Sequence, residues 1–254
     1  MNPSRLLHRI GVVIARFLTA EVETHPLAAP EPIERLRRIM QPGDVLLVEG
    51  RSRVSQPIKY LTQSTWSHAA LYVGPLPGRV QADGEPDVLV EADLADGVRS
   101  SPLTRYRDSH VRICRPVNLG GADLEKLVAF ATTRLGAQYD LRNLFDLFRF
   151  LAPTPPIPSR WRRRFIAVGS GAPSRAIYST LIAEAFHSIH YPVLPTIELV
   201  RAGDPRTQSH VTREILHIRD SSLYTPRDFD LSPFFAVVKP ELVEGFDYRR
   251  VIWA

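Results

Sequence analysis

Four side chains in this sequence have types and surroundings suited to hydrolytic chemistry. Tyr178 and Ser179 lie where an apolar run predicts the first turns of a helix. His68 opens an apolar strand, and Glu91 closes the next strand along the chain. Hydrolysis by a side-chain nucleophile needs that nucleophile at a helix N-terminus, an imidazole base, and a polar group that orients the imidazole. We therefore expect His68 and Glu91 to meet, provided that their strands pair antiparallel.

The elements that must position these residues follow from hydrophobic periodicity and from turn residues. Strands are predicted at 45–48, 69–73, 88–91, 111–116, 234–239 and 247–253. Helices are predicted at 32–40, 55–62, 121–134, 141–151 and 174–189. Because strands and helices come in blocks, the order favours an α+β fold over a doubly wound parallel sheet.

The chain divides into an N-terminal segment, residues 1–35, and one domain, residues 36–254. The segment combines an amphipathic helix at 4–19 with a proline-containing linker, and the domain carries a Pro/Arg-rich insertion at 152–173. Three interpretations of the helix compete. It packs on the domain, it lies in a membrane interface, or it is a signal peptide. The last is the weakest, because Arg16 interrupts the apolar stretch.

Composition sets broad limits on the protein's class. The chain has 254 residues, 44% of them hydrophobic, and a net charge of +5 in which arginine greatly outnumbers lysine. An arginine surplus suits phosphate or carboxylate contacts, but it equally describes a solvated surface. No apolar run is long enough to span a bilayer. Cys114 is the only cysteine, so no intramolecular disulfide can form, and its alternating strand pattern predicts a buried structural thiol.

Neither a metal nor another cofactor is expected from the motifs. The histidines show no metal-ligand spacing, and no glycine-rich phosphate loop is present. The cluster Arg160–Arg164 could contact acidic headgroups or nucleic acid. We expect no nucleic-acid binding, because Trp161 is the only aromatic residue in the cluster and no known motif accompanies it. A solvated loop is the default interpretation of this cluster. Among functional interpretations, an anionic membrane surface that contacts residues 1–20 together with Arg160–Arg164 is favoured over nucleic acid.

An ordered set of short motifs carries a family resemblance. In chain order they are Gly43–Val48, Ser67–Gly74, Glu91-Ala92 with Gly97-Val98, Gly136 with Tyr139-Asp140, and Ser179–Phe186. The set resembles the YiiX/YebB-like group of NlpC-type cysteine hydrolases, over roughly residues 40–240. The resemblance implies an α+β, circularly permuted papain-like fold, in which a small antiparallel sheet packs on helices.

The same resemblance assigns roles and exposes a departure. His68 would be the base, Glu91 its orienting acid, and position 178 the nucleophilic cysteine, where this chain has Tyr178. A phenol with a pKa of about 10 is a poor nucleophile at neutral pH. Ser179 could substitute, but one helical step turns a side chain by about 100°. A hydroxyl bonded to a backbone carbonyl is the alternative for Ser179. Tyr178 could instead donate its hydroxyl to His68.

Three functions follow as alternatives. The first is a protein of amide or ester hydrolase ancestry, directed to peptide or lipid acyl groups and impaired by Tyr178. The second is a non-catalytic module that binds an acyl or peptidyl ligand. The third is a membrane-surface interaction protein. We expect a cytoplasmic location, or one peripheral to the inner membrane. The sequence predicts neither the substrate nor the oligomeric state.

Overall fold

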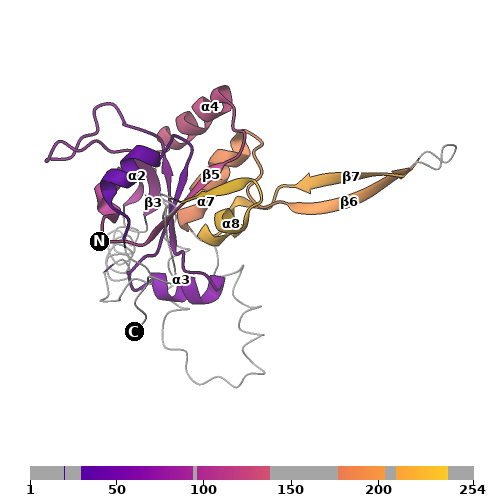
Figure 1. The fold of residues 1–254 in the computed structure, drawn as a ribbon, viewed down its shortest axis with the longest axis horizontal. Coiled ribbons are helices and arrows are strands. Elements are labelled where there is room, and N and C mark those ends of the chain that lie inside the picture. Colours follow the sequence, from indigo (N-terminus) through magenta and orange to yellow (C-terminus); the bar gives the residue numbers. More distant parts are fainter. Residues whose placement is uncertain (1–19, 21–29, 94–95, 138–176, 204–209, 240–254) are drawn as a thin grey trace, which may run out of the picture.

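Two β-structures make up the framework of the protein (Figure 1). The computed structural model describes residues 20, 30–93, 96–137, 177–203 and 210–239. Within them, six strands form an antiparallel sheet in the order β4-β3-β2-β1-β5-β8. These strands are β1 (Val45–Val48), β2 (His68–Tyr72), β3 (Leu89–Asp93), β4 (Gly97–Ser101), β5 (Val111–Pro116) and β8 (Phe235–Val238). A separate hairpin joins β6 (Thr196–Gly203) to β7 (His210–His217).

Short helices surround the sheet. They are α2 (Ile33–Ile39), α3 (Ser55–Thr62), α4 (Gly121–Thr132), α7 (Ile177–Ser188) and α8 (Pro226–Leu231), with 3₁₀ turns η1 (Leu103–Tyr106) and η2 (Ser221–Leu223). The start of α8 is fixed by a capping box, in which the side chains of Thr225 and Asp228 each bond the other's backbone. No helix among the described residues has the length and apolar character needed to cross a membrane.

The two faces of the sheet carry separate apolar cores, because side chains alternate along each strand. On the first face, which we call the α7 face, Leu47, Leu71 and Val90 cluster with Leu181, Ile182 and Phe186 of α7. On the second, the η1 face, Leu46, Ala70 and Leu89 cluster with Leu36 of α2 and with Leu103 and Tyr106 of η1. The central strands of the sheet are therefore buried on both faces.

The direction of α7 across its face is set by contacts just beyond its C-terminus. The hydroxyl of Tyr191, a single donor, lies within hydrogen-bond distance of two carbonyl oxygens, that of Val117 at 2.8 Å and that of Phe234 at 2.7 Å. These carbonyls lie at the end of the sheet where β5 finishes and β8 begins, opposite the end where Val48 pairs with His68. Since α7 also packs against β2 and β3, its first turn points toward the end of the sheet that holds His68.

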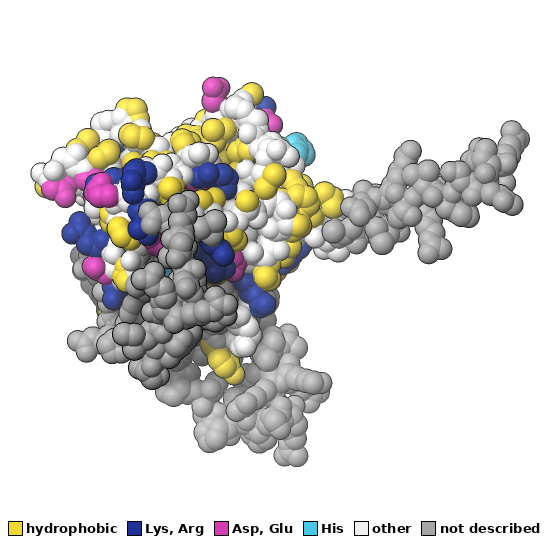
Figure 2. Space-filling view, viewed as in Figure 1, with side chains coloured by type: hydrophobic (Ala, Val, Ile, Leu, Met, Phe, Trp, Pro, Cys, Tyr) yellow, Lys and Arg dark blue, Asp and Glu magenta, His cyan; other side chains and the backbone are white. Residues whose placement is uncertain are grey.

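The hairpin β6–β7 projects away from the body of the protein (Figure 1). Apolar side chains are visible on the side of the body from which it extends (Figure 2), and Leu216 and Ile218, at the end of β7, are 41% and 49% exposed. The hairpin strands pair only with each other in the part of the chain that is described. They therefore add nothing to the sheet that carries His68 and Glu91.

Most predicted elements are confirmed within the described residues. The strand at 45–48, the helix at 55–62 and the strand at 111–116 have the predicted bounds. The strand predicted at 88–91 instead runs from Leu89 to Asp93, so Glu91 lies in its middle and not at its end. Strands β4, β6 and β7 and helix α8 were not predicted.

Several predicted segments lie outside the described residues. These are the helix at 4–19, the linker up to residue 29, the helix at 141–151, the insertion at 152–173 and the strand at 247–253. The division into residues 1–35 and 36–254 stays a prediction.

Candidate active site

His68 and Glu91 meet across the β2–β3 pairing, as predicted. The Nε2 atom of His68 lies 2.6 Å from Oε2 of Glu91. Glu91 is paired with Ala70, two residues from His68, so both side chains project from the same face of the sheet. That face is the η1 face, because Ala70 belongs to its core. The carboxylate of Glu91 is completely buried, whereas the side chain of His68 keeps 13% of its surface exposed.

Three further side chains surround the carboxylate of Glu91. The hydroxyl of Tyr106, in η1, donates to Oε2, the oxygen that also contacts His68. The Nε atom of Arg99, in β4, lies 3.1 Å from Oε1, and the Nε atom of Arg105 lies 3.6 Å from the same oxygen. Sequence reasoning did not identify any of these three partners. Both oxygens of the buried carboxylate are thus satisfied, as a charge removed from water requires.

Arg99 connects Glu91 to two other acidic side chains. Its Nη2 atom lies 3.0 Å from Asp93, and its Nη1 atom lies 2.8 Å from Asp96. Burial lowers the pKa of Arg99, but the charges of Glu91 and Asp93 outweigh that effect and raise it above its usual range. Arg99 is therefore a permanent cation that links β3 and β4 beside the candidate site.

The environment keeps Glu91 ionised. Burial by itself raises the pKa of a carboxyl group, but the hydrogen bond and charge of His68, the charge of Arg99 and the hydroxyl of Tyr106 lower the pKa of Glu91 well below its usual range. Burial and the charge of Glu91 raise the pKa of Tyr106 well above that of an ordinary phenol. Tyr106 is consequently a neutral donor, and Glu91 is a charged acceptor.

An ionised Glu91 determines which nitrogen of His68 carries the proton. A carboxylate can only accept hydrogen bonds, so Nε2 of His68 must be the donor in their contact. In the neutral ring, Nδ1 then has the lone pair that accepts a proton. This is the arrangement that a general base oriented by an acid requires, in which one nitrogen is held and the other reacts.

The two candidate nucleophile positions lie in the first turn of α7, which packs on the α7 face of the sheet, whereas His68 and Glu91 project from the η1 face. The backbone of Tyr178 is helical, but its side chain is outside the described set. Ser179 is fully buried, and its hydroxyl donates to the carbonyl oxygen of Tyr224 at 2.5 Å. The alternative role predicted for Ser179 was a hydroxyl bonded to a backbone carbonyl, and the contact with Tyr224 agrees with it. A role of Ser179 as substitute nucleophile stays a prediction, and it would require the hydroxyl to leave this bond.

A second polar cluster lies at the same end of the sheet. Glu49, just after β1, contacts Nζ of Lys59 at 2.9 Å and Nδ1 of His110 at 3.1 Å. The ring of Trp66 packs against His110, with 5.0 Å between centroids. Glu49 follows Val48, so it projects from the α7 face, opposite to His68. The cluster ties α3 to the sheet and takes no part in the His68–Glu91 pair.

Within the described ranges, the other ligand-type side chains do not form a metal centre. No three His, Cys, Asp or Glu side chains among the described residues are grouped so that they could hold a metal ion. His187 packs edge-on against Tyr224, with 5.2 Å between ring centroids, and burial lowers its pKa. Its ring is therefore a neutral packing group at physiological pH.

Cys114 should label slowly in the native protein. The thiol is fully buried, and burial, assisted by the charge of Asp230, raises its pKa to about 12. At pH 8 its thiolate fraction would be about a thousandth of that of an ordinary cysteine with a pKa of about 8.5. We expect alkylation by iodoacetamide to be at least about 100-fold slower in the folded protein than in urea. Equal rates in the two states would show that Cys114 is accessible.

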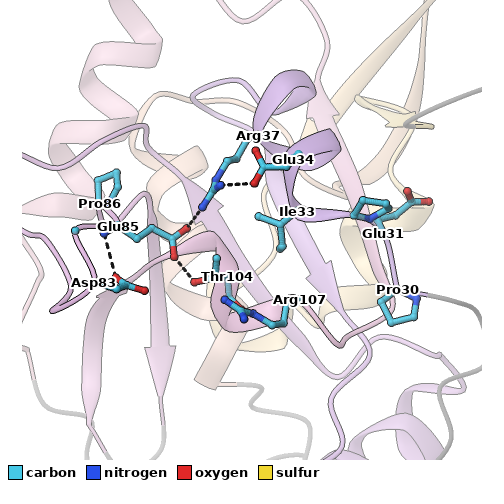
Figure 3. A pocket seen from close by; sticks show the side chains of 12 residues that line it. Pro30, Glu31, Ile33, Glu34, Arg37, Asp83, Glu85, Pro86, Thr104 and Arg107 are labelled. Carbon is cyan, nitrogen blue, oxygen red and sulfur yellow. Dashed lines mark hydrogen bonds and ion pairs between the residues drawn. The ribbon is translucent and has the colours of Figure 1, made fainter.

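The described residues also form an open hollow of about 800 Å³ that is separate from the pair (Figure 3). It lies between the start of α2, the loop before β3, and η1. Glu85 anchors its wall by accepting hydrogen bonds from Arg37, at 2.7 Å, and from Thr104. Neither His68 nor Glu91 lines it. Its polar side chains are largely paired with one another, so the hollow is a weaker candidate for chemistry than the buried pair.

The sheet, the helix packed on it and the pair held between β2 and β3 define a permuted papain-like fold of the α+β class. Residues 39–146 match the family described as permuted papain-like amidase enzyme, YaeF/YiiX, C92 family. The match confirms the resemblance predicted from the sequence, and with it the hydrolase ancestry of the chain. It includes His68 and Glu91 but ends before Tyr178 and Ser179, so it does not bear on the nucleophile.

One solved structure illustrates the similarity. The metalloprotein yiiX from Escherichia coli O157:H7 superposes on 79% of this chain and 97% of its own, with 16% sequence identity and a TM-score of 0.45. None of the curated proteins matches the chain.

Proposed function

We propose that this protein descends from an amide- or ester-hydrolysing enzyme and retains its base while lacking its thiol. The observation that carries the proposal is the buried carboxylate of Glu91, ionised and bonded to His68 at 2.6 Å, while α7 has Tyr178 at the position of the expected cysteine. In this proposal His68 is the base, Glu91 orients it, and turnover of peptide or lipid acyl substrates is low or absent.

The chemical reason is the difference between a phenol and a thiol. At a helix N-terminus, beside an imidazolium, the thiolate of a cysteine is favoured. A phenol begins about 1.5 pKa units above a cysteine, and a shift large enough for reaction at pH 7 would cost about 4 kcal/mol. A tyrosine ring is also far bulkier than a thiol. Hydrolysis of an activated ester by the wild type, abolished by Ser179→Ala, would contradict the proposal and show that the serine has taken over.

A second candidate function is the binding of an acyl or peptidyl ligand without turnover. It is favoured by the same cluster, because a polar group partly open to solvent beside an apolar core can orient an amide or ester. Calorimetry with a non-hydrolysable acyl amide tests it. Saturable binding that His68→Ala weakens supports the binding role, and no binding by either protein rejects it.

Residues 1–19 and Arg160–Arg164 lie outside the described residues, and we propose that residues 1–20 and this arginine cluster bind anionic membranes. Attraction to such a surface is about 1 kcal/mol per basic residue, and an apolar helix face adds to it. Co-sedimentation with vesicles that contain an anionic lipid should weaken when residues 1–20 are deleted or when salt is raised. Equal binding to neutral vesicles, or binding to neither kind, would reject the electrostatic role.

A further inference from the structure

The hydroxyl of Tyr106 and the imidazole of His68 share one oxygen of Glu91. Both donate to Oε2, whereas Oε1 faces Arg99. Tyr106 is buried and comes from η1, a turn outside the β2–β3 pairing. Oε2 of Glu91 orients the imidazole of His68, and the hydroxyl of Tyr106, from η1, holds that oxygen in place.

A carboxylate with only two hydrogen-bonding partners would be held less firmly in one orientation. The terminal torsion of a glutamate has a broad energy profile, so rotation about it is easily excited. Rotation of Glu91 would weaken its bond to Nε2 and allow His68 to adopt the other tautomer, with the proton on Nδ1. The contact from Arg99 to Oε1 restrains one oxygen, and the hydroxyl of Tyr106 restrains the other.

The turn that carries Tyr106 is itself held in place. Leu103 is buried in the core of the η1 face, and the hydroxyl of Thr104 donates to Glu85. The backbone N–H of Arg107 bonds to the carbonyl of Thr104 and closes the turn at 3.1 Å. Tyr106 therefore approaches Glu91 from an anchored position, as a group that orients a site must.

We propose that Tyr106 is a positioning residue, which fixes Oε2 of Glu91 and thereby keeps His68 in the tautomer protonated on Nε2. This inference deepens the proposed function, because a base at Nδ1 is useful only if that function holds. The tautomer itself exists whether or not the protein turns over a substrate. It can therefore be measured independently of activity.

The test is long-range ¹H–¹⁵N NMR of the His68 ring at neutral pH, with its signals assigned by their loss in His68→Ala. In the wild type, the neutral ring should be protonated at Nε2. In Tyr106→Phe, the ratio of the two neutral tautomers should shift toward Nδ1–H by about fivefold, the change equivalent to the net contribution of one hydrogen bond, about 1 kcal/mol. Glu91→Gln should shift it in the same direction.

Tyr72→Phe is the matched control. Tyr72 packs on the same core, but its hydroxyl has no bond to Glu91 among the described residues, so the tautomer ratio should not change. An unchanged ratio in Tyr106→Phe would overturn the proposal and leave Tyr106 a packing residue. A wild-type ring protonated at Nδ1 would also overturn the proposal, because it contradicts the contact between Nε2 and Glu91.

A second readout separates this inference from the proposed function. In a protein that carries Tyr178→Cys, adding Tyr106→Phe should slow alkylation at position 178 several-fold. If the tautomer shifts but the new thiol is unreactive from the outset, the proposed function fails and the positioning role of Tyr106 stands. If the new thiol is reactive but the tautomer does not respond to Tyr106→Phe, the positioning role fails and the proposed function stands.

Discussion

Replacing Tyr178 with cysteine should create a thiol that reacts with iodoacetamide at pH 6 about tenfold faster than the same thiol in a protein that lacks His68. An ordinary cysteine, with a pKa of about 8.5, is about 0.3% thiolate at pH 6. An imidazolium that lowers the pKa by about two units would raise this to about a quarter. The lower nucleophilicity of the more acidic thiolate removes about eightfold of that gain. A net factor of about ten remains.

The chain offers a favourable background for this experiment. Its only native cysteine is Cys114, which is fully buried, so labelling of the wild type measures the background directly. The four proteins to compare are the wild type, Tyr178→Cys, and each of these with His68→Ala. Fast labelling of Tyr178→Cys that depends on His68 supports the proposed ancestry of position 178. Labelling that is equal with and without His68 would mean that the imidazole does not act on this position.

Replacing Glu91 with glutamine should destabilise the protein by about 3 kcal/mol at pH 7, since removing one member of a buried ion pair leaves the other charge uncompensated. Glu91 is completely buried, and Arg99, which would lose one of its three carboxylate partners, keeps only 20% of its side-chain surface exposed. Urea unfolding at pH 7 gives the difference directly. Glu34→Gln is the control, because Glu34 pairs with Arg37 on the surface with 78% of its side chain exposed, and we expect little change there.

The difference between wild type and Glu91→Gln should depend on pH. The pKa of Glu91 is lowered in the folded protein, so its ionisation stabilises the fold fully above the unfolded pKa of about 4.3 and progressively less as the pH falls toward the folded pKa. Glutamine does not titrate. The gap should therefore shrink by up to about 1.4 kcal/mol per unit below about pH 4. A gap that stays constant down to pH 3 would show that Glu91 is not an ionised partner of His68 and Arg99.

The contact between His68 and Glu91 could be predicted from the sequence because it depends only on the pairing of two consecutive strands. Two apolar strands that follow one another along the chain commonly pair, and antiparallel pairing brings the start of one beside the end of the next. The prediction ended the second strand at Glu91. In the structure the strand continues to Asp93, because Arg99 compensates the charges of both Glu91 and Asp93.

The partners of Glu91 could not be predicted in the same way. Arg99 reaches Glu91 through the register of β3 and β4, in which the two residues are directly opposite. The strand β4 contains only one large apolar residue, Val98, so it has no alternating pattern to indicate it. Tyr106 lies in a single 3₁₀ turn, for which the sequence has no periodic signal. Both contacts depend on the tertiary fold rather than on local pattern.

The shared burial of Glu91, His68, Arg99 and Tyr106 has a consequence for how such proteins change over evolutionary time. Each of these side chains pairs with a buried charge or hydrogen-bond donor that would otherwise lack a partner. The loss of any one of them therefore destabilises the fold, even when no reaction depends on it. A lineage that gives up its nucleophile is therefore under pressure to keep the rest of the machinery. Under the proposed function, an intact histidine–glutamate pair in a relative would record inheritance, and the residue at position 178 would distinguish an enzyme from a pseudoenzyme.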